Sequence, residues 1–534
     1  MTHAFDPRHP VPVPLTAVAA AAGAAGAVDR DHPRSTGPTG TGATVSGVAV
    51  SAADVRPGSL FAALPGRRTH GAEHAAAAAA AGAAAVLTDP AGADRSRATG
   101  LPVLVVDDPR AVLGAVAAST YGTASLPFPV FGVTGTNGKT STVHLLDAVM
   151  RRLGWRTALT STVERRIDRD AVPSALTTPE APELHAFLAR AAEDRVRGVA
   201  LEVSAQGLSR HRSDGLQVDV AGFTNLSHDH LDDYGDMAAY LAAKARLFTP
   251  EHARAGVVSL DSDAGRRIVE RASVPVTTIA SERAAGADWT IDVVQQRPDG
   301  TRALVHAPDG SEVALDVPLL GVHMAADAAL AVAMLATAGV PLDDLRTALS
   351  TPLDVVVPGR MADASAATGP RVFVDFAHTP DAIEKSLSAI RAFTRGRVAI
   401  VLGADGDRDP SKRGAMGSVA ASGADVVVVA DHHPRFEDPA RIRSAVLAGA
   451  WTVRTRALVR EEPDPSRAIR TALDAVEESG DDGAVYWAGP GLTDYRDVAG
   501  VHVPFSSFEE ARAALRERGH RPGARPGALT LTAN

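Results

Sequence analysis

The chain has 534 residues, of which 45% are hydrophobic and 22% charged, values typical of a globular protein with room for about three domains. Its net charge of −9 is small for this length and argues against binding to nucleic acid. The absence of cysteine excludes disulfides, thiolate metal sites and cysteine nucleophiles.

Two alanine-rich segments lie in the N-terminal part, at residues 15–28 and 75–86. Glycines interrupt both and no basic region precedes the first, so we expect helices rather than a signal peptide or a membrane span. Short strand-like runs accompany them at residues 48–50, 84–87 and 103–106. We therefore predict a cytoplasmic protein without membrane insertion, whose first domain spans residues 1–125.

A glycine-rich turn follows a strand-like run at residues 129–133 and precedes a helix-like segment at 141–150. It reads Gly135-Thr136-Asn137-Gly138-Lys139-Thr140-Ser141. The backbone amides of such a turn, with the N-terminus of the next helix, bind polyphosphate. Lys139 would contact the β- and γ-phosphates, and the Thr140 hydroxyl would coordinate Mg²⁺. The spacing is not that of the usual P-loop, because Val133 stands where that motif has glycine, so a glycine-rich turn with a chance lysine is the alternative.

From Val130 onward, strand-like and helix-like segments alternate, which predicts a parallel sheet with ligands at the carboxyl ends of its strands. Glu202 and His230 fall at such ends, and Lys244 lies on a probable helix. Taken singly, they could be a surface carboxylate, a loop histidine and a solvated lysine. Together, behind a phosphate loop, Glu202 and His230 supply ligands suited to Mg²⁺ in an ATP site.

A second junction falls at residues 355–360, after which a new series of strand-like runs begins. These runs are at residues 372–374, 398–402, 426–429 and 485–487. We predict a three-domain α/β protein with a central parallel-sheet, P-loop-type ATPase domain at 126–357 and a Rossmann-like C-terminal domain at 358–534. Residues 519–534, rich in Pro, Gly and Arg, are expected to form a mobile tail.

The ordered motifs resemble those of the Mur ligases, and within them the UDP-N-acetylmuramoyl-tripeptide synthetases. The resemblance rests on residues 135–140, 177–179, 202–204, 224–232, 240, 244, 358–361, 375–381 and 406–409. It implies that ATP phosphorylates the free carboxylate of UDP-MurNAc-L-Ala-D-Glu, or of a close variant. The amine of an incoming amino acid then attacks the acyl phosphate, a step of peptidoglycan precursor synthesis.

The resemblance also implies roles for individual residues. The catalytic group is Lys139, Glu202, His230 and Lys244. Two Mg²⁺ ions are implied, one at Thr140 with the phosphates and one at Glu202 and His230, with Lys244 modified by CO₂ to an N6-carboxylysine ligand. Residues 135–141 with Asn225, Arg360, Asp375 and His378 would bind ATP. Val50, Ala52, Thr177, Thr178, Ser204, Arg210 and Arg212 would bind the UDP substrate, although the family's Asp-Ser-Arg stands here as Ser51-Ala52-Ala53.

The amino-acid site departs from the family pattern. Its implied residues are Arg408, His432, His433, Pro434, Arg435, Gly489 and Thr493. The Asp-Asn-Pro-Arg of enzymes that add diaminopimelate appears as His432-His433-Pro434-Arg435, and Gly-Lys-Gly-His-Glu appears as residues 489–493, ending in Thr493. Burying an ammonium group without an anionic partner costs about 3–5 kcal/mol. Our hypothesis is therefore a neutral or differently charged side chain, homoserine being one candidate, unless Asp431 or Asp494 compensates.

Three alternatives remain open from the sequence. A related ligase, of the folylpolyglutamate or cyanophycin type, would share the phosphate loop and the carboxylated lysine. A non-catalytic ATP-binding protein is a second possibility, which intact Lys139, Glu202, His230 and Lys244 argue against. A metal site at His432 and His433 is the third, and it lacks a third ligand in the sequence. We expect a monomer.

Overall fold

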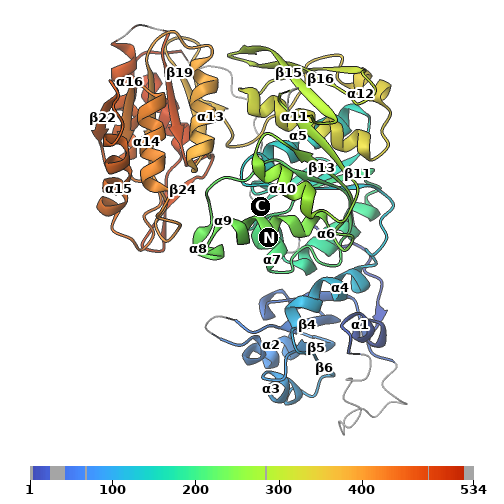
Figure 1. Ribbon diagram of the computed structural model, residues 1–534. Coiled ribbons are helices and arrows are strands. Elements are labelled where there is room, and N and C mark those ends of the chain that lie inside the picture. Colours follow the sequence, from blue (N-terminus) through green and yellow to red (C-terminus); the bar gives the residue numbers. More distant parts are fainter. Residues whose placement is uncertain are drawn as a thin grey trace.

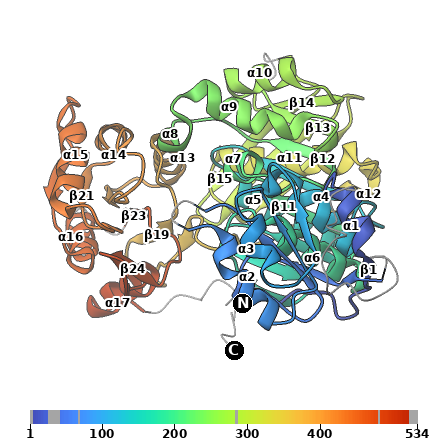
Figure 2. The ribbon, with the colours of Figure 1, turned by 90° about the horizontal axis from the view of Figure 1, so that it is seen from below.

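The computed structural model describes residues 4–24, 42–66, 69–282, 286–478, 480 and 482–521. Three α/β units follow one another along the chain, and Figure 1 shows them from blue at the bottom, through cyan to yellow, to orange and red. Helix α13 (Pro380–Arg391) is the part of the third unit that lies nearest the central unit in Figures 1 and 2. Residues 25–28 of the first alanine tract and 522–534 of the expected tail lie outside the described residues.

The first unit is a four-stranded parallel sheet in the order β3-β4-β5-β6. Its strands are β3 (Gly47–Ala49), β4 (Ser59–Ala63), β5 (Ala85–Thr88) and β6 (Val103–Val105); β1 (Val13–Pro14) pairs with β2 (Thr44–Val45), and the helices are α1 (Leu15–Ala21), α2 (Ala75–Ala80), α3 (Ala93–Arg97) and α4 (Pro109–Tyr121). Helix α4 begins where the Asp108 carboxylate accepts hydrogen bonds from two backbone amides, and it ends at Gly122, whose φ is +68°.

The central unit is an eleven-stranded sheet in the order β10-β9-β8-β11-β7-β12-β13-β14-β15-β16-β17. Its strands are β7 (Val130–Thr134), β8 (Thr157–Thr160), β9 (Glu164–Ile167), β10 (Asp170–Pro173), β11 (Gly198–Glu202), β12 (Val218–Phe223), β13 (Ala253–Ser259), β14 (Val276–Ala280), β15 (Trp289–Arg297), β16 (Gly300–His306) and β17 (Glu312–Val317). The predicted parallel arrangement holds from β8 to β15. Antiparallel hairpins, which the sequence analysis did not foresee, form both edges.

Helices cover both faces of this sheet. They are α5 (Lys139–Arg152), α6 (Ala181–Glu193), α7 (Ala205–Ser209), α8 (Leu231–Tyr234), α9 (Met237–Ala245), α10 (Asp263–Arg271), α11 (Val322–Thr337) and α12 (Leu342–Ala348). Helices α5 and α11 bury their apolar side chains together on one face, and α6 packs on the other. The apolar burial on both faces explains why the central strands read as continuous hydrophobic runs. Among the described residues, no helix has both the length and the apolar composition needed to cross a bilayer.

The third unit is a six-stranded sheet in the order β18-β19-β23-β20-β21-β22, parallel except for β18. Its strands are β18 (Ala362–Asp363), β19 (Arg371–Asp375), β20 (Val398–Leu402), β21 (Val426–Val429), β22 (Leu458–Glu461) and β23 (Ala484–Ala488). Helices α13, α14 (Arg413–Gly423) and α15 (Pro439–Trp451) cover one face, and α16 (Pro465–Glu477) and α17 (Ser507–Glu517) cover the other. A hairpin of β24 (Tyr495–Val498) and β25 (Val501–Pro504) follows β23.

Candidate active site

The phosphate loop joins β7 to α5, and its two glycines are required by close contacts. Gly135 and Gly138 have φ values of +153° and +87°. A Cβ atom on Gly135 would lie 1.9 Å from Thr224 Oγ1, and one on Gly138 would lie 2.6 Å from Asp327 Oδ1. The Asn225 side chain fixes the middle of the loop, because its Oδ1 accepts a 3.0 Å hydrogen bond from the Asn137 amide. The contacts with Thr224, Asn225 and Asp327 therefore hold the loop in a single conformation.

Two lysines meet at the carbonyl oxygens of this loop. Lys139 Nζ donates to the oxygens of Gly135 and Thr136, at 3.1 and 2.8 Å. Lys244 Nζ donates to the same Gly135 oxygen at 2.6 Å and lies 4.2 Å from the centre of the Tyr240 ring. Burial, together with the charge of Lys139, lowers the pKa of Lys244 well below its ordinary value. A lysine whose ammonium form is disfavoured in this way is available as an amine nucleophile.

Glu202 ends β11 beside the loop and is 1% exposed. Its carboxylate accepts hydrogen bonds from the Thr162 amide and hydroxyl, both at 2.9 Å, and it forms no ion pair with any residue that the structure describes. His230 has a φ of +56° and packs edge-on against the Tyr240 ring, and burial lowers its pKa. Both side chains interact electrostatically with Lys139 of the phosphate loop. A buried carboxylate without an ion-pair partner and a neutral imidazole beside this loop are donors that fit Mg²⁺.

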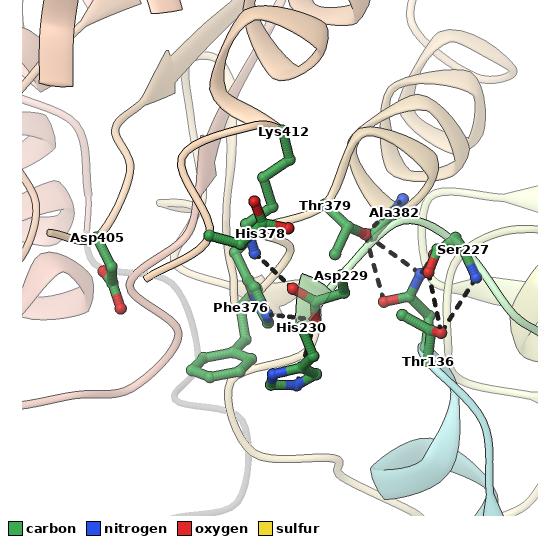
Figure 3. Close-up of polar contacts among 12 residues, drawn as sticks. Thr136, Ser227, Asp229, His230, Phe376, His378, Thr379, Ala382, Asp405 and Lys412 are labelled. Atoms are coloured by element: carbon green, nitrogen blue, oxygen red, sulfur yellow. Dashed lines mark hydrogen bonds and ion pairs between the residues drawn. The ribbon is translucent and has the colours of Figure 1, made fainter. Parts of the chain in front are cut away.

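Asp229 connects the central unit to the third unit (Figure 3). Its Oδ1 accepts a 2.7 Å hydrogen bond from Lys412 Nζ, and its Oδ2 lies 3.6 Å from His378 Nε2. Burial raises the pKa of Asp229, but the hydrogen bond and charge of His378 and the charges of Lys412 and His230 lower it further, so the net pKa is below its usual range. Asp229 belongs to the motif at residues 224–232, and its contact with the third unit was not predicted from the sequence.

A second set of contacts between the two units lies directly over the phosphate loop. Asn137 Nδ2 donates to Thr379 Oγ1 at 3.2 Å and to Asp381 Oδ2 at 3.0 Å. Arg360 Nη2 donates to Thr140 Oγ1 at 3.0 Å. The third unit thus contacts the loop through the Asp381 carboxylate and the Arg360 guanidinium. Arg360 is placed to pair with negative charge bound at the loop.

Asp375, expected to bind ATP, has its carboxylate occupied by protein groups. Oδ2 accepts from Ser386 Oγ at 3.0 Å and Tyr486 Oη at 2.9 Å, while Oδ1 accepts from the Phe376 amide at 2.8 Å. The Phe376 amide also donates to the Gly359 carbonyl oxygen. This arrangement fixes the turn that carries Arg360.

The other end of the site is formed by loops that follow β20, β21 and β23, and we call Asp405, His432, His433 and Arg435 the amino-acid end. Asp405 Oδ1 accepts a 2.7 Å hydrogen bond from His432 Nδ1, and Arg435 Nη2 lies 3.4 Å from Asp405 Oδ2. His433 Nδ1 accepts from the Asp497 amide at 2.9 Å, and burial lowers the pKa of His433 to about 4. Asp405, His432 and His433 present ligand atoms within 4.8 Å of one another, so Asp405 is the third polar group that the sequence analysis did not find.

A cavity of about 640 Å³, here called the central cavity, connects the phosphate loop with the amino-acid end. All predicted catalytic and metal-binding residues line it, as do all predicted ATP-site residues except Gly135 and all amino-acid-site residues except Pro434. Thr177 and Ser204 line it from the predicted substrate set. Five further residues, for which no role was predicted from the sequence, also line it: Thr162, Asp229, Tyr240, Asp327 and Asp405.

The remaining predicted substrate residues lie elsewhere. Thr178 is 2% exposed and donates to the Glu202 carbonyl oxygen. Arg212 Nε donates to Glu180 Oε1 at 3.0 Å, and Arg210 pairs with Asp233 at 3.5 Å. Val50 lines a separate cavity of about 310 Å³ between the first and central units, whereas Ala52 begins a short 3₁₀ turn and does not line it. Their substrate-binding roles stay predictions.

The central and third α/β units line one cavity around a glycine-rich phosphate loop, an arrangement that defines a nucleotide-dependent enzyme. Family models match along most of the chain: "Mur ligase family, catalytic domain" at residues 44–121, "Mur ligase middle domain" at 133–335 and "Mur ligase, glutamate ligase domain" at 359–491. The UDP-N-acetylmuramyl-tripeptide synthetase of Leifsonia xyli subsp. xyli is 50% identical over 97% of this chain and 98% of its own length. The chain belongs to the Mur ligase family.

Other relatives and solved structures agree with this family assignment. A UDP-N-acetylmuramoyl-L-alanyl-D-glutamate–2,6-diaminopimelate ligase of Streptomyces coelicolor is 41% identical over 89% of this chain and 93% of its own. A solved ligase of the same description superimposes with a TM-score of 0.64 at 25% identity, covering 96% of this chain and 100% of the other. Mycobacterium tuberculosis folylpolyglutamate synthase, complexed with ADP and AMPPCP, shares the fold with a TM-score of 0.58 at 20% identity, over 77% and 95% of the two chains.

Proposed function

We propose that this ligase adds the third amino acid to UDP-MurNAc-L-Ala-D-Glu, or to a close variant, through an acyl phosphate. The observation that carries the proposal is the shared cavity: the phosphate loop, Glu202, His230 and Lys244 open into the same space as loops of the third unit. The 50% identical relative, which is a tripeptide synthetase by name, supports this substrate class.

The chemistry follows from the poor reactivity of a carboxylate, which must gain a phosphate leaving group before an amine can attack it. The loop amides and Lys139 would hold the polyphosphate chain, and Arg360 would stabilise charge on the transferred phosphoryl group. An oxygen of the substrate carboxylate forms a bond to the γ-phosphorus as the bond to ADP breaks. The incoming amine then attacks the acyl carbon, loses a proton, and phosphate departs to leave the amide.

Thr140 would hold one Mg²⁺ together with the phosphates, and Glu202 and His230 would hold a second. The two ions would supply charge neutralisation between two anionic reactants. Lys244 would carry a carboxyl group derived from CO₂, since carbamate formation requires an unprotonated amine. Its burial and its lowered pKa support this role. The modification would turn a buried cation into an anionic oxygen ligand for Mg²⁺, near Glu202 and His230.

The UDP substrate would extend from Thr177 and Ser204 in the central cavity toward the cavity of about 310 Å³ beside Val50. We propose domain divisions at residues 1–125, 126–357 and 358–534, which agree with the separate sheets. We propose that the active form is a monomer, because the loops of a single chain supply the residues that line the central cavity.

A ligation assay tests the proposal. Purified protein would be incubated with ATP, Mg²⁺, UDP-muramoyl-dipeptide and a panel of amino acids, and the product mass determined. We expect an ATP-dependent tripeptide product with stoichiometric ADP and phosphate. Ligation of glutamate to a folate in place of this product would favour the folylpolyglutamate alternative, and nucleotide binding without any ligation would favour a non-catalytic protein.

A further inference from the structure

Thr162 lies in the turn between β8 and β9, next to the carboxyl end of β11. Because β8 and β11 are parallel neighbours in the central sheet, the residues that follow them leave the same edge. Ser161 fixes the turn, since its Oγ accepts hydrogen bonds from two backbone amides of the same turn, both at 3.1 Å. The Thr162 side chain is therefore held beside Glu202, which ends β11.

The Thr162 hydroxyl connects Glu202 with Thr177. Thr162 Oγ1 lies 2.9 Å from Glu202 Oε2 and 3.1 Å from Thr177 Oγ1. A carboxylate can only accept and a hydroxyl has a single proton, so Thr162 donates to Glu202 and accepts from Thr177. The two hydroxyl protons thus point along one chain, from Thr177 through Thr162 to Glu202.

Thr162 also orients Glu202, the expected ligand of a divalent cation. The Thr162 amide donates to Oε1 and the hydroxyl donates to Oε2, both at 2.9 Å, so each carboxylate oxygen is held by one bond and keeps a lone pair for a cation. Partners that hold a metal ligand in this way contribute about 10- to 100-fold to metal affinity.

The direction of the chain determines what Thr177 can bind. Thr177 is partly exposed and lines the central cavity, as do Thr162 and Glu202. Because its proton is donated to Thr162, the Thr177 hydroxyl can accept a hydrogen bond from a bound molecule but cannot donate one. An N–H group of a substrate fits this position, whereas a carboxylate or phosphate oxygen does not.

The Ser204 hydroxyl has the same orientation. Thr178 Oγ1 donates to the Glu202 carbonyl oxygen at 3.0 Å, so Ser204 is the donor in the 3.1 Å contact between Ser204 Oγ and Thr178 Oγ1. Ser204 Oγ also accepts from the Gly207 amide at 2.9 Å, which leaves it one lone pair. Ser204 is partly exposed and lines the central cavity. Thr177 and Ser204 therefore both offer the cavity an acceptor and no donor.

We propose that Thr162 is a positioning residue of the ligase, whose hydroxyl orients the Glu202 carboxylate for a divalent cation and directs the Thr177 proton away from the substrate. Thr177 and Ser204 then accept hydrogen bonds from the peptide N–H groups of the UDP-muramoyl-dipeptide, the donors that adjoin its reactive carboxylate. The inference rests on the proposed ligase function and adds which substrate groups these two hydroxyls recognise.

Binding of Mn²⁺ to the full chain without nucleotide, followed by electron paramagnetic resonance of the free ion, tests the role toward Glu202. Thr162→Val keeps the amide hydrogen bond and the side-chain shape but lacks the hydroxyl, so the Kd for Mn²⁺ should rise about tenfold. Thr162→Ser should restore the original Kd. The matched control is Thr347→Val, which removes a hydroxyl that donates to the Asp343 carbonyl oxygen on α12 and should have no effect. Unchanged Mn²⁺ affinity in Thr162→Val, or no Mn²⁺ binding by the unchanged protein, would overturn this role.

Substrate analogues test the role toward Thr177. A UDP-muramoyl-dipeptide with ester oxygens in place of its peptide N–H groups should bind with a Kd about tenfold higher in isothermal titration calorimetry, the scale of a lost hydrogen bond. This difference should shrink in Thr177→Val, whose Kd for Mn²⁺ should stay unchanged because Thr162 still donates to Glu202.

Equal affinity of the unchanged protein for the ester and amide forms would overturn the assignment of N–H donors. A loss of Mn²⁺ affinity in Thr177→Val as large as that in Thr162→Val would contradict the direction of the hydroxyl chain. Either result, with tripeptide still formed by the unchanged protein, would leave the ligase function standing. No tripeptide product with any amino acid would overturn both.

Discussion

The two ends of the central cavity differ in what holds them in place. At the phosphate loop, backbone carbonyl oxygens accept the hydrogen bonds of Lys139 and Lys244, and Gly135 and Gly138 admit no side chain. At the amino-acid end, side chains on two separate loops meet, and His432 Nε2 finds no partner among the described residues. A backbone site tolerates little sequence change, whereas a side-chain site can be altered by single substitutions. We therefore expect the phosphate loop to determine the reaction and the amino-acid end to determine the substrate.

We expect the greatest loss of activity from a substitution that removes the charge of Glu202 and keeps the shape of its side chain. Glu202→Gln should reduce ligation by about 1000-fold, the scale of losing a preorganised electrostatic group. The glutamine oxygen can still accept from Thr162, so the fold should persist, and thermal unfolding measures this. The exposed Glu270 of α10 provides the control, as Glu270→Gln should have no effect. Activity of Glu202→Gln within tenfold of the original would show that the carboxylate is not needed.

The next largest loss of activity is expected from breaking the Asp229–Lys412 contact between the central and third units. Lys412→Met leaves the Asp229 carboxylate, whose side chain is 7% exposed, without its 2.7 Å cationic partner. His378 and His230 remain beside this carboxylate, but removing one partner of a buried ion pair is costly, and the change should lower kcat/KM by about 100-fold through impaired closure of the third unit.

A double-mutant cycle sharpens this prediction. Asp229→Asn combined with Lys412→Met should lose less activity than the two single effects added together, because the uncompensated charge is then gone. Strictly additive losses would mean that the two side chains act independently.

A smaller effect, on the free energy of unfolding, is expected when the pH is lowered and the buried His144 becomes protonated. His144 lies on α5 behind the phosphate loop, and burial lowers its pKa to about 4. Because the folded state holds this imidazole neutral, its contribution is complete above the unfolded pKa of about 6.5 and is lost as pH falls toward 4. The loss should reach about 2 kcal/mol at pH 5.

Denaturant unfolding at several pH values measures that loss. His144→Gln should flatten the profile between pH 6.5 and 4 by the same amount. The control is His9→Gln, a change at an exposed histidine, which should leave the profile as it was. A His144→Gln profile that is as steep as that of the unchanged protein would contradict a neutral buried His144.

Much of the fold could be predicted because strand and helix patterns are local. The runs at 130–134 and 198–202 are apolar on both faces, and they form the buried centre of a parallel sheet. The edge hairpins β9–β10 and β16–β17 escaped prediction because antiparallel pairing at a sheet edge depends on which strands become neighbours. The phosphate loop was predictable for the same reason as the central strands, since its two glycines are only three positions apart in the chain.

The amino-acid end could be predicted only in part. His432 and His433 stood out as substitutions in a known motif, but Asp405 lies 27 residues from His432 in the sequence. No local pattern shows that the two side chains meet. Asp229 was similarly missed because its partner Lys412 is 183 residues away. Contacts of this kind arise only when parallel strands bring their following loops to one edge, or when two units pack together.

Activation of the substrate carboxylate as an acyl phosphate can be tested through the fate of its oxygen atoms. The most direct measurement uses a UDP-muramoyl-dipeptide whose reactive carboxylate carries a heavy oxygen isotope, with ATP and the preferred amino acid. We predict that one labelled oxygen appears in the released phosphate, because that oxygen bridges carbon and phosphorus in the intermediate. Unlabelled phosphate released in step with tripeptide product would contradict the mechanism.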